Sequence, residues 1–144
     1  MAADGLEVYT AKQFLYSQLT ADSTLAALGV YDEEAPPSSS YPCIEFRYLS
    51  NTPQKGVGDV TVLTTQLWLV VAISESRTPP FSFQPLQGYV GRIFTQLDRQ
   101  SATTANGQTL WSSFEQGFQR RFYDGSTGYE YREEGAQYRL WVQN

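Results

Sequence analysis

The chain of 144 residues contains no histidine and only one cysteine, Cys43. Without histidine, neither a Ser-His-Asp nor a Cys-His catalytic arrangement can be built, and the commonest metal ligand is missing. One cysteine leaves too few ligands for a zinc site and cannot close an internal disulfide. We therefore expect no enzyme, no metal and no cofactor, although chemistry that uses carboxylates alone stays open.

Basic residues are also scarce, with 10 Lys and Arg against 15 Asp and Glu, which gives a net charge of −5. A nonspecific nucleic-acid binder needs a dense basic face, so tight phosphate binding is not expected. Gly56 and Gly58 lack the third glycine and the strand-to-helix context of a dinucleotide loop. No stretch is long and apolar enough to span a membrane, and residues 1–10 do not read as a secretory signal.

Aromatic residues are plentiful at 15%, and hydrophobic residues reach 41%. This composition excludes a disordered chain, and the length is common for one domain. We predict a single domain over residues 1–144, in which the polar residues 1–9 form a flexible or interface-ordered arm. Cys43 stands in a strand-like segment and is expected to be a buried apolar residue.

Helix signals occur at three places. Thr10 and Gln13 fit a capping box that opens a helix with an apolar face. Asp22 or Ser23 can cap a short second helix that closes at Gly29. Apolar residues then recur at helical spacing after Pro85 and predict a third helix: Leu86, Tyr89, Val90, Ile93, Phe94 and Leu97.

Strand signals occupy most of the remainder. A short extended piece is expected at residues 30–32, and residues 41–50 alternate as in a half-buried strand. Residues 51–58 read as a flexible connection to the longest strand, residues 59–74, which predicts a long hairpin. Residues 67–73 are apolar on both faces and predict a central strand. Later strands are expected at 109–114, 119–123 and 137–143. The order predicts an α+β fold: an antiparallel sheet with a long hairpin and two main helices packed on one face.

Paired charges offer the only candidates for chemistry. Glu33-Glu34 and Glu133-Glu134 stand in loop-like sequence and are expected to be solvated surface charge. Residues 124–128 read as a turn, because they lack the alternating acids of a calcium loop. Arg120 and Arg121 are adjacent, and either salt bridges or a phosphate contact would use them.

Three features indicate an interface. Aromatic residues cluster late in the chain, the proline-bounded loop 75–84 carries apolar residues, and strands at 59–65 and 137–143 could present free edges. The alternative is a self-contained monomer whose aromatics are all core. The residues that we predict to make contacts between subunits or with another component of an assembly are Asp59, Val60, Thr61, Val62, Phe81, Phe83, Arg139 and Trp141.

The layout resembles the tail terminator proteins of long-tailed bacteriophages, also called tail-completion or head–tail joining proteins. The resembling elements are the opening helix and short Asp-initiated helix, the proline-then-strand element, the long strand, the second main helix and the closing strand: residues 14–28, 41–46, 66–71, 86–97 and 135–142. The loop 77–83 departs from the family's short loop.

The resemblance implies a virion protein at the head–tail interface, present in the host cytoplasm during assembly. Such proteins form a ring, usually a hexamer, that caps the tail tube, ends its polymerisation and meets a neck or connector protein. Double-stranded DNA passes through without specific binding, and an acidic or neutral lumen would let it slide. Other readings are another phage neck protein, such as a connector or stopper, and a small-ligand-binding or carboxylate-dependent hydrolase domain.

Overall fold

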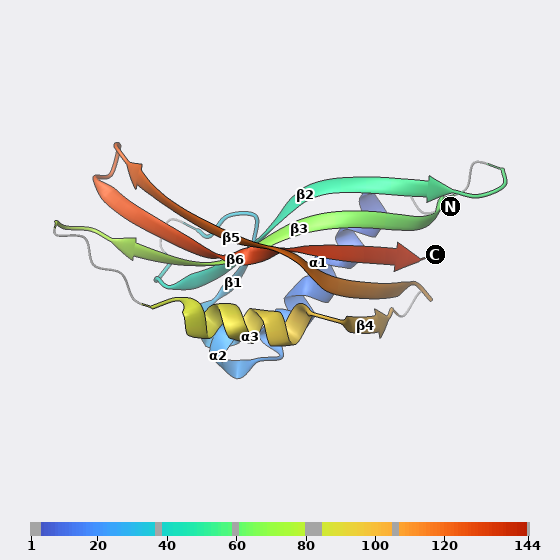
Figure 1. Ribbon diagram of the computed structural model, residues 1–144, viewed down its shortest axis with the longest axis horizontal. Helices are drawn as coiled ribbons and strands as arrows, with labels where there is room; N and C mark the ends of the chain where they lie inside the picture. The colour runs from blue at the N-terminus through green and yellow to red at the C-terminus, as the bar shows by residue number, and fades with distance from the viewer. Residues whose placement is uncertain (1–3, 37–38, 59–60, 80–84, 105–106, 144) are drawn as a thin grey trace.

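The computed structural model describes residues 4–36, 39–58, 61–79, 85–104 and 107–143, and within them the chain forms one six-stranded sheet and three helices (Figure 1). The α+β class is thereby confirmed. The elements, in chain order, are α1 (Asp4–Thr20), α2 (Ser23–Leu28), β1 (Val30–Asp32), β2 (Cys43–Lys55), β3 (Thr61–Ser76), α3 (Gln87–Leu97), β4 (Gln100–Thr103), β5 (Thr109–Asp124) and β6 (Tyr129–Gln143).

The sheet has the strand order β1-β2-β3-β6-β5-β4 and curls into a half-barrel (Figure 1). The prediction of a purely antiparallel sheet with two helices is corrected, because β1 runs parallel to β2, with Val30 beside Ile44. The parallel pair arises because the chain travels through residues 33–42 before it returns in the same direction. Every other neighbouring pair is antiparallel.

The long hairpin of β2 and β3 is confirmed, and it extends beyond the predicted strand. Its ladder runs from Cys43 opposite Ile73 to Lys55 opposite Thr61. Residues 51–55, expected as a flexible connection, therefore belong to β2. Their polar composition favours a loop locally, but pairing with β3 satisfies their backbone groups and overrides that preference.

The main core lies between the sheet and the helices. Ile44, Trp68, Val70 and Tyr138 from the sheet pack there with Leu15 of α1 and further buried residues of all three helices or their ends. A second, smaller cluster lies on the other sheet face: Ala35, Cys43, Leu69, Val71 and Ile73. β3 is thus covered on both faces, as predicted for residues 67–73, and Cys43 is fully buried, also as predicted.

The first helix begins at Asp4, so the predicted N-cap at Thr10 is wrong and residues 4–9 are helical instead of forming an arm. Tertiary contacts explain the early start. Glu7 is buried and accepts a hydrogen bond of 2.6 Å from the Thr64 hydroxyl of β3. The Thr10 hydroxyl donates to Gln108 Oε1 at 2.9 Å. Glu7 thus fastens the helix to β3, and Thr10, predicted as its cap, fastens it to the segment before β5.

The predicted free edges are also wrong. Leu63 of β3 pairs with Gln54 of β2 on one side and with Gln143 of β6 on the other. The final strand likewise lies between β3 and β5, with Trp141 opposite both Thr65 and Trp111. Among the described residues the outermost strands are the short β1 and β4. Side-chain alternation indicates which face of a strand is buried, but it does not reveal strand order.

Candidate functional site

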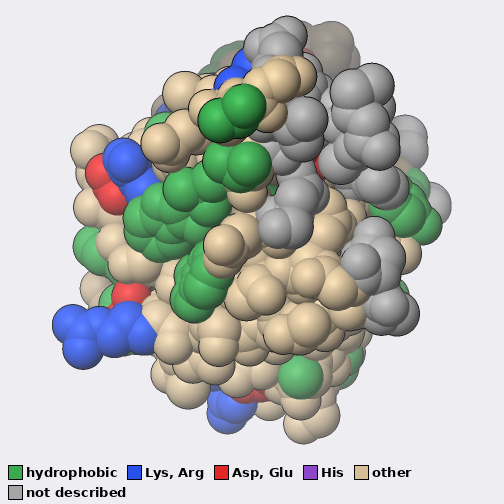
Figure 2. Space-filling view, turned by 90° about the vertical axis from the view of Figure 1, so that its right-hand side faces the viewer, with side chains coloured by type: hydrophobic (Ala, Val, Ile, Leu, Met, Phe, Trp, Pro, Cys, Tyr) green, Lys and Arg blue, Asp and Glu red, His purple; other side chains and the backbone are tan. Residues whose placement is uncertain are grey.

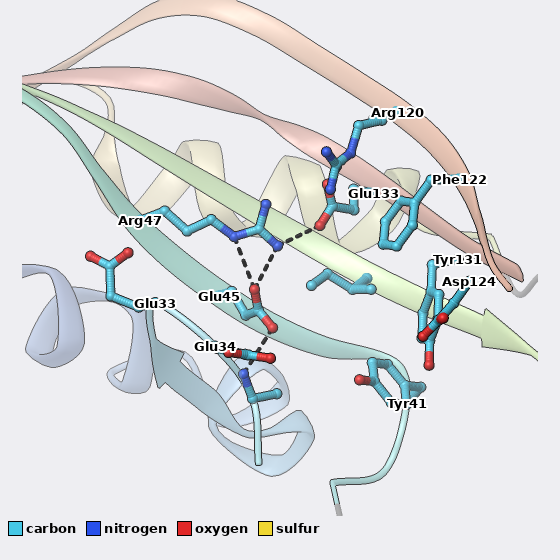
Figure 3. Close-up of a pocket in the computed structure, with 12 residues that line it drawn as sticks. Glu33, Glu34, Tyr41, Glu45, Arg47, Arg120, Phe122, Asp124, Tyr131 and Glu133 are labelled. Carbon is cyan, nitrogen blue, oxygen red and sulfur yellow. Dashed lines mark hydrogen bonds and ion pairs between the residues drawn. The ribbon is translucent and has the colours of Figure 1, made fainter. Parts of the chain in front are cut away.

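A polar cavity of about 400 Å³ lies on the sheet face opposite the helices (Figure 3). Strands β2, β3, β5 and β6 and the segment between β1 and β2 supply its walls. Its lining residues are Glu33, Glu34, Ala35, Tyr41, Glu45, Arg47, Ile73, Arg120, Phe122, Asp124, Tyr131 and Glu133. Alternation along β2 directs Glu45 and Arg47 to this face, while Ile44 and Phe46 enter the main core.

Arg47 joins two buried carboxylates at one end of the cavity (Figure 3). Its Nε and Nη2 donate to Glu45 Oε1 at 3.0 and 2.6 Å, and Nη2 also donates to Glu133 Oε2. The other oxygen of Glu45 accepts the Ala35 backbone N–H at 2.9 Å. Burial would lower the pKa of Arg47, but hydrogen bonds to Glu133 and Glu45 outweigh it and hold that pKa above its usual range. Arg47 therefore remains charged.

Arg120 completes the charge cluster. Its Nε donates to Glu133 Oε1 at 3.0 Å, and its guanidinium lies 4.4 Å from the ring centre of Phe122. Phe122 stacks on Tyr131, and Tyr131 meets Tyr41 edge-on. Burial, aided by nearby negative groups, raises the pKa of Tyr41 to about 12, so its hydroxyl stays protonated at neutral pH. Two arginines, two carboxylates and three rings thus pack as one unit.

The carboxylates of Glu45 and Glu133 are fully engaged within the cluster. Each of their four oxygens accepts a hydrogen bond from the protein. In the described part of the chain, no group of three or more acids or Cys is placed to hold a metal ion. Glu33, Glu34 and Asp124 line the same cavity, so its lining carries five carboxylates against two guanidinium groups.

The two predicted acid pairs differ in burial. Glu33 and Glu34 are exposed, as expected, but Glu133 and Glu134 are buried, so the prediction of solvated charge is wrong for this pair. The two lie on β6, where neighbouring side chains point to opposite faces. Glu134 accepts a hydrogen bond from Gln119 of β5 and forms an ion pair with Arg132 of β6. Arginine partners thus compensate the burial of both acids: Arg132 for Glu134, and Arg47 and Arg120 for Glu133.

Arg120 and Arg121 of β5 both form salt bridges, one of the two uses expected from the sequence. Arg120 pairs with Glu133 and Arg121 with Glu130, each across the β5–β6 ladder. Neighbouring positions on a strand project to opposite faces, which explains why the two cations find different partners. The turn prediction for residues 124–128 also holds, with Asp124 accepting the Ser126 backbone N–H at 2.9 Å.

A different surface lies at the end of the molecule where the β2–β3 hairpin and the C-terminus meet, the right-hand end in Figure 1. An apolar hollow of about 440 Å³ opens there, lined by Gln54, Val62, Leu63, Trp111, Trp141 and Gln143. Trp111 stands opposite Trp141 in the β5–β6 ladder and is 38% exposed, and Val62 is 43% exposed. Figure 2 shows this end face-on, with hydrophobic side chains exposed across it.

The hollow brings together only part of the predicted interface. Val62 and Trp141 line it, and Arg139 lies nearby on β6, held at 2.8 Å by Glu115. Thr61 begins β3, whereas Asp59, Val60, Phe81 and Phe83 lie outside the described residues. Sequence reasoning missed Trp111 as a partner of Trp141. The late clustering of aromatics included both tryptophans, but their pairing depends on the β5–β6 register.

No protein-family model matches the chain, and no curated protein matches it. None of the described helices is long and apolar enough to cross a membrane.

Proposed function

We propose that this chain is a tail terminator of a long-tailed bacteriophage: a structural protein whose copies form a ring, taken to be a hexamer, at the end of the tail tube. The ring ends tube polymerisation and joins the tail to the head or neck, so its partners are tail tube protein and a neck or connector protein. It acts in the virion and assembles in the host cytoplasm. It carries out no reaction and needs no cofactor.

The observation that carries this proposal is the tryptophan pair at one end of the sheet, in which Trp111 is exposed and Trp141 is half-buried. Trp111 and Trp141, with Val62 and Leu63, form an apolar surface in the hollow described above. Tryptophans are enriched at the centres of protein interfaces, where they contribute much of the binding energy. A protein that docks on a tube end needs such a surface at one end of an elongated sheet.

The charge and the polar cavity agree with the same role. The net charge of −5 disfavours DNA retention and suits a ring through which DNA slides. The arginine–carboxylate cluster stiffens the sheet face opposite the helices without offering a reactive group. The order of helices and strands follows the pattern that resembles the terminator family.

Substitution of Trp141 tests the docking surface. Trp141→Ala removes a large apolar contact at the hollow, and truncation of an interface tryptophan commonly costs about 2 kcal/mol or more, roughly a 30-fold loss of affinity. We expect the variant to cap tail tubes at least tenfold less well in negative-stain micrographs. Tyr123→Ala provides the control, because Tyr123 is 62% exposed at the opposite end of β5. Equal loss of capping in both variants contradicts the assignment of this end.

A further inference from the structure

The outer sides of β2 and β5 are each covered over only part of their length. β1 pairs with residues 44–46 of β2, and β4 pairs with residues 109–112 of β5. Among the described strands, residues 50–54 of β2 and 116–120 of β5 have a neighbour on one side only. Figure 1 shows β4 beside the first part of β5, at the end where β2 is outermost. The two uncovered stretches therefore lie on opposite sides of the sheet and toward opposite ends.

Hydrogen bonds at both edges establish which backbone groups point outward. The Glu33 carboxylate accepts the Tyr48 N–H at 3.0 Å, and the Asp98 carboxylate accepts the Phe114 N–H at 3.0 Å. Each strand then has one bulge, between Tyr48 and Ser50 and between Phe114 and Gln116. A bulge shifts the alternation by one residue, so Asn51 and Pro53 on β2, and Gly117 and Gln119 on β5, direct their backbone groups outward.

The two edges complement each other as hydrogen-bonding surfaces. Pro53 has no N–H, and at an outward position this absence leaves the β2–β3 ladder intact. The β2 edge consequently offers the carbonyls of Asn51 and Pro53 and a single N–H. The β5 edge offers the N–H groups of Gly117 and Gln119. Residues 50–54 carry no charge, and Arg120 at the end of the β5 stretch is already paired with Glu133, so like charges do not oppose pairing.

Strand directions favour contact between different edges of successive copies. Because β2, β3, β6 and β5 alternate in direction, β2 and β5 run oppositely. When a ring repeats the same orientation around its axis, β5 of one copy lies antiparallel to β2 of the next. A repeated contact between unlike surfaces forms a ring when the rotation between copies closes on itself, whereas pairing of β5 with another β5 gives a two-fold dimer.

The offset between the stretches keeps β4 of one copy clear of β2 of the next. Thr52 lies at the level of Trp141 on β6, and Phe118 lies at the level of Gly135, six residues along the same strand. Pairing the stretches therefore staggers neighbouring copies by about 20 Å at 3.3 Å per residue. With this stagger, β4 passes beyond the end of β2, while Asp124 at the end of β5 comes level with the part of β2 that β1 covers, so the contact requires the last residues of β5 to turn away from β1. Closed barrels require a stagger of this kind.

We infer that a second copy of this chain adds its β2 edge to the β5 edge, with Asn51 of one copy opposite Gln119 of the next. The inference rests on the proposed ring and names the contact that builds it. Asn51 and Gln119 direct their side chains to one face of the sheet. The flanking pair, Thr52 and Phe118, share the opposite face. The sheets of all copies then join into one continuous sheet.

Cross-linking tests this contact. The double variant Asn51→Cys with Gln119→Cys places two thiols across the expected pair, where the Cα separation of about 5.5 Å suits a disulfide. Under mild oxidation, in rings formed alone or on tube ends, we expect a ladder of covalent multimers up to the ring size. Cys43 does not interfere, because burial raises the pKa of its thiol to about 12. The matched control, Asn51→Cys with Thr95→Cys on the exposed side of α3, should remain monomeric on denaturing gels.

The possible outcomes distinguish a failure of this edge contact from a failure of the proposed ring. If the double variant forms rings that show no more cross-linking than the control, edge pairing is wrong while the ring proposal survives. Covalent dimers from Gln119→Cys alone show β5–β5 pairing and overturn the inference. If wild-type protein stays monomeric and never binds tube ends, the proposed function fails first. Gln119→Pro, which deletes one outward N–H, should lower assembly at least tenfold relative to Gln119→Ala, with equal thermal stability of the two monomers.

Discussion

Glu133 is 1% exposed and holds the side chains of two strands together, because Arg47 of β2 and Arg120 of β5 both donate to it. A buried carboxylate is costly unless it is paired, so its burial depends on both arginines. Sequence alone placed this residue at the surface, since nothing in a Glu-Glu pair reveals that arginines on two other strands converge on one of them.

Glu133→Gln should therefore destabilise the fold by about 3 kcal/mol, the low end for a broken buried pair, because Arg47 retains Glu45. Urea unfolding of the monomer followed by tryptophan fluorescence measures the change. Glu115→Gln is the matched control: its pair with Arg139 is exposed, and its loss should cost less than about 1 kcal/mol. Equal effects from the two substitutions contradict the cluster's role.

Asp22 gives the fold a pH-dependent contribution. Partial burial opposes its ionisation, but hydrogen bonds from Leu25, Arg92 and Thr24 prevail and hold its pKa below the ordinary 3.8. A lowered pKa in the folded state adds stability that is present above about pH 4 and is lost as pH falls through the folded value.

Asp22→Asn keeps a capping oxygen but removes this charge. We expect a lower Tm than wild type at pH 7 and a difference that narrows at pH 3, measured by circular dichroism. Arg92→Gln removes only the ion pair at 3.0 Å, so its smaller effect at pH 7 should fade in high salt. A Tm difference for Asp22→Asn that is constant from pH 7 to pH 3 contradicts the linkage.

At the scale of elements, the sequence predicted the features that depend on interactions between residues close together in the chain. The Asp22 cap, the Gly29 end of α2, the amphipathic α3 and the long β2–β3 hairpin follow from spacing and turn residues. The start of α1 and the identity of the edge strands do not, because Glu7 meets Thr64 and β6 inserts between β3 and β5 only in three dimensions. For the same reason, the sequence predicted Val62 and Trp141 as contact residues of the hollow but did not reveal that Trp111 lies beside Trp141.

Gly135 shows how closely the central strands approach. A Cβ at this position would lie 2.0 Å from the Val70 carbonyl oxygen. Gly135→Ala should therefore destabilise the fold by about 2 to 3 kcal/mol through overpacking. Gly91→Ala is the control: open space surrounds this position in α3, and the substitution should stabilise the helix by up to about 1 kcal/mol. Chemical denaturation measures both. Equal stability of the two variants contradicts the close packing of β6 on β3.

At the scale of the whole molecule, one end of the curled sheet and its lateral edges have different tasks in the proposed ring. The end with Trp111 and Trp141 provides the apolar surface for the tube, while the uncovered edges of β2 and β5 provide contacts between copies. The arginine–carboxylate cluster lies on the sheet face away from the helices and ties β2, β6 and β5 together. Such a division requires no reactive group and no bound cofactor.

The most direct measurement of the tail-terminator proposal is the length of cognate tail tubes grown with and without the purified protein, imaged by negative-stain electron microscopy. The proposal predicts tubes that stop at a fixed length and carry a ring at one end, with the ring absent when the protein is omitted. Tubes that continue to lengthen with their ends bare, in the presence of a protein that remains monomeric, would contradict it.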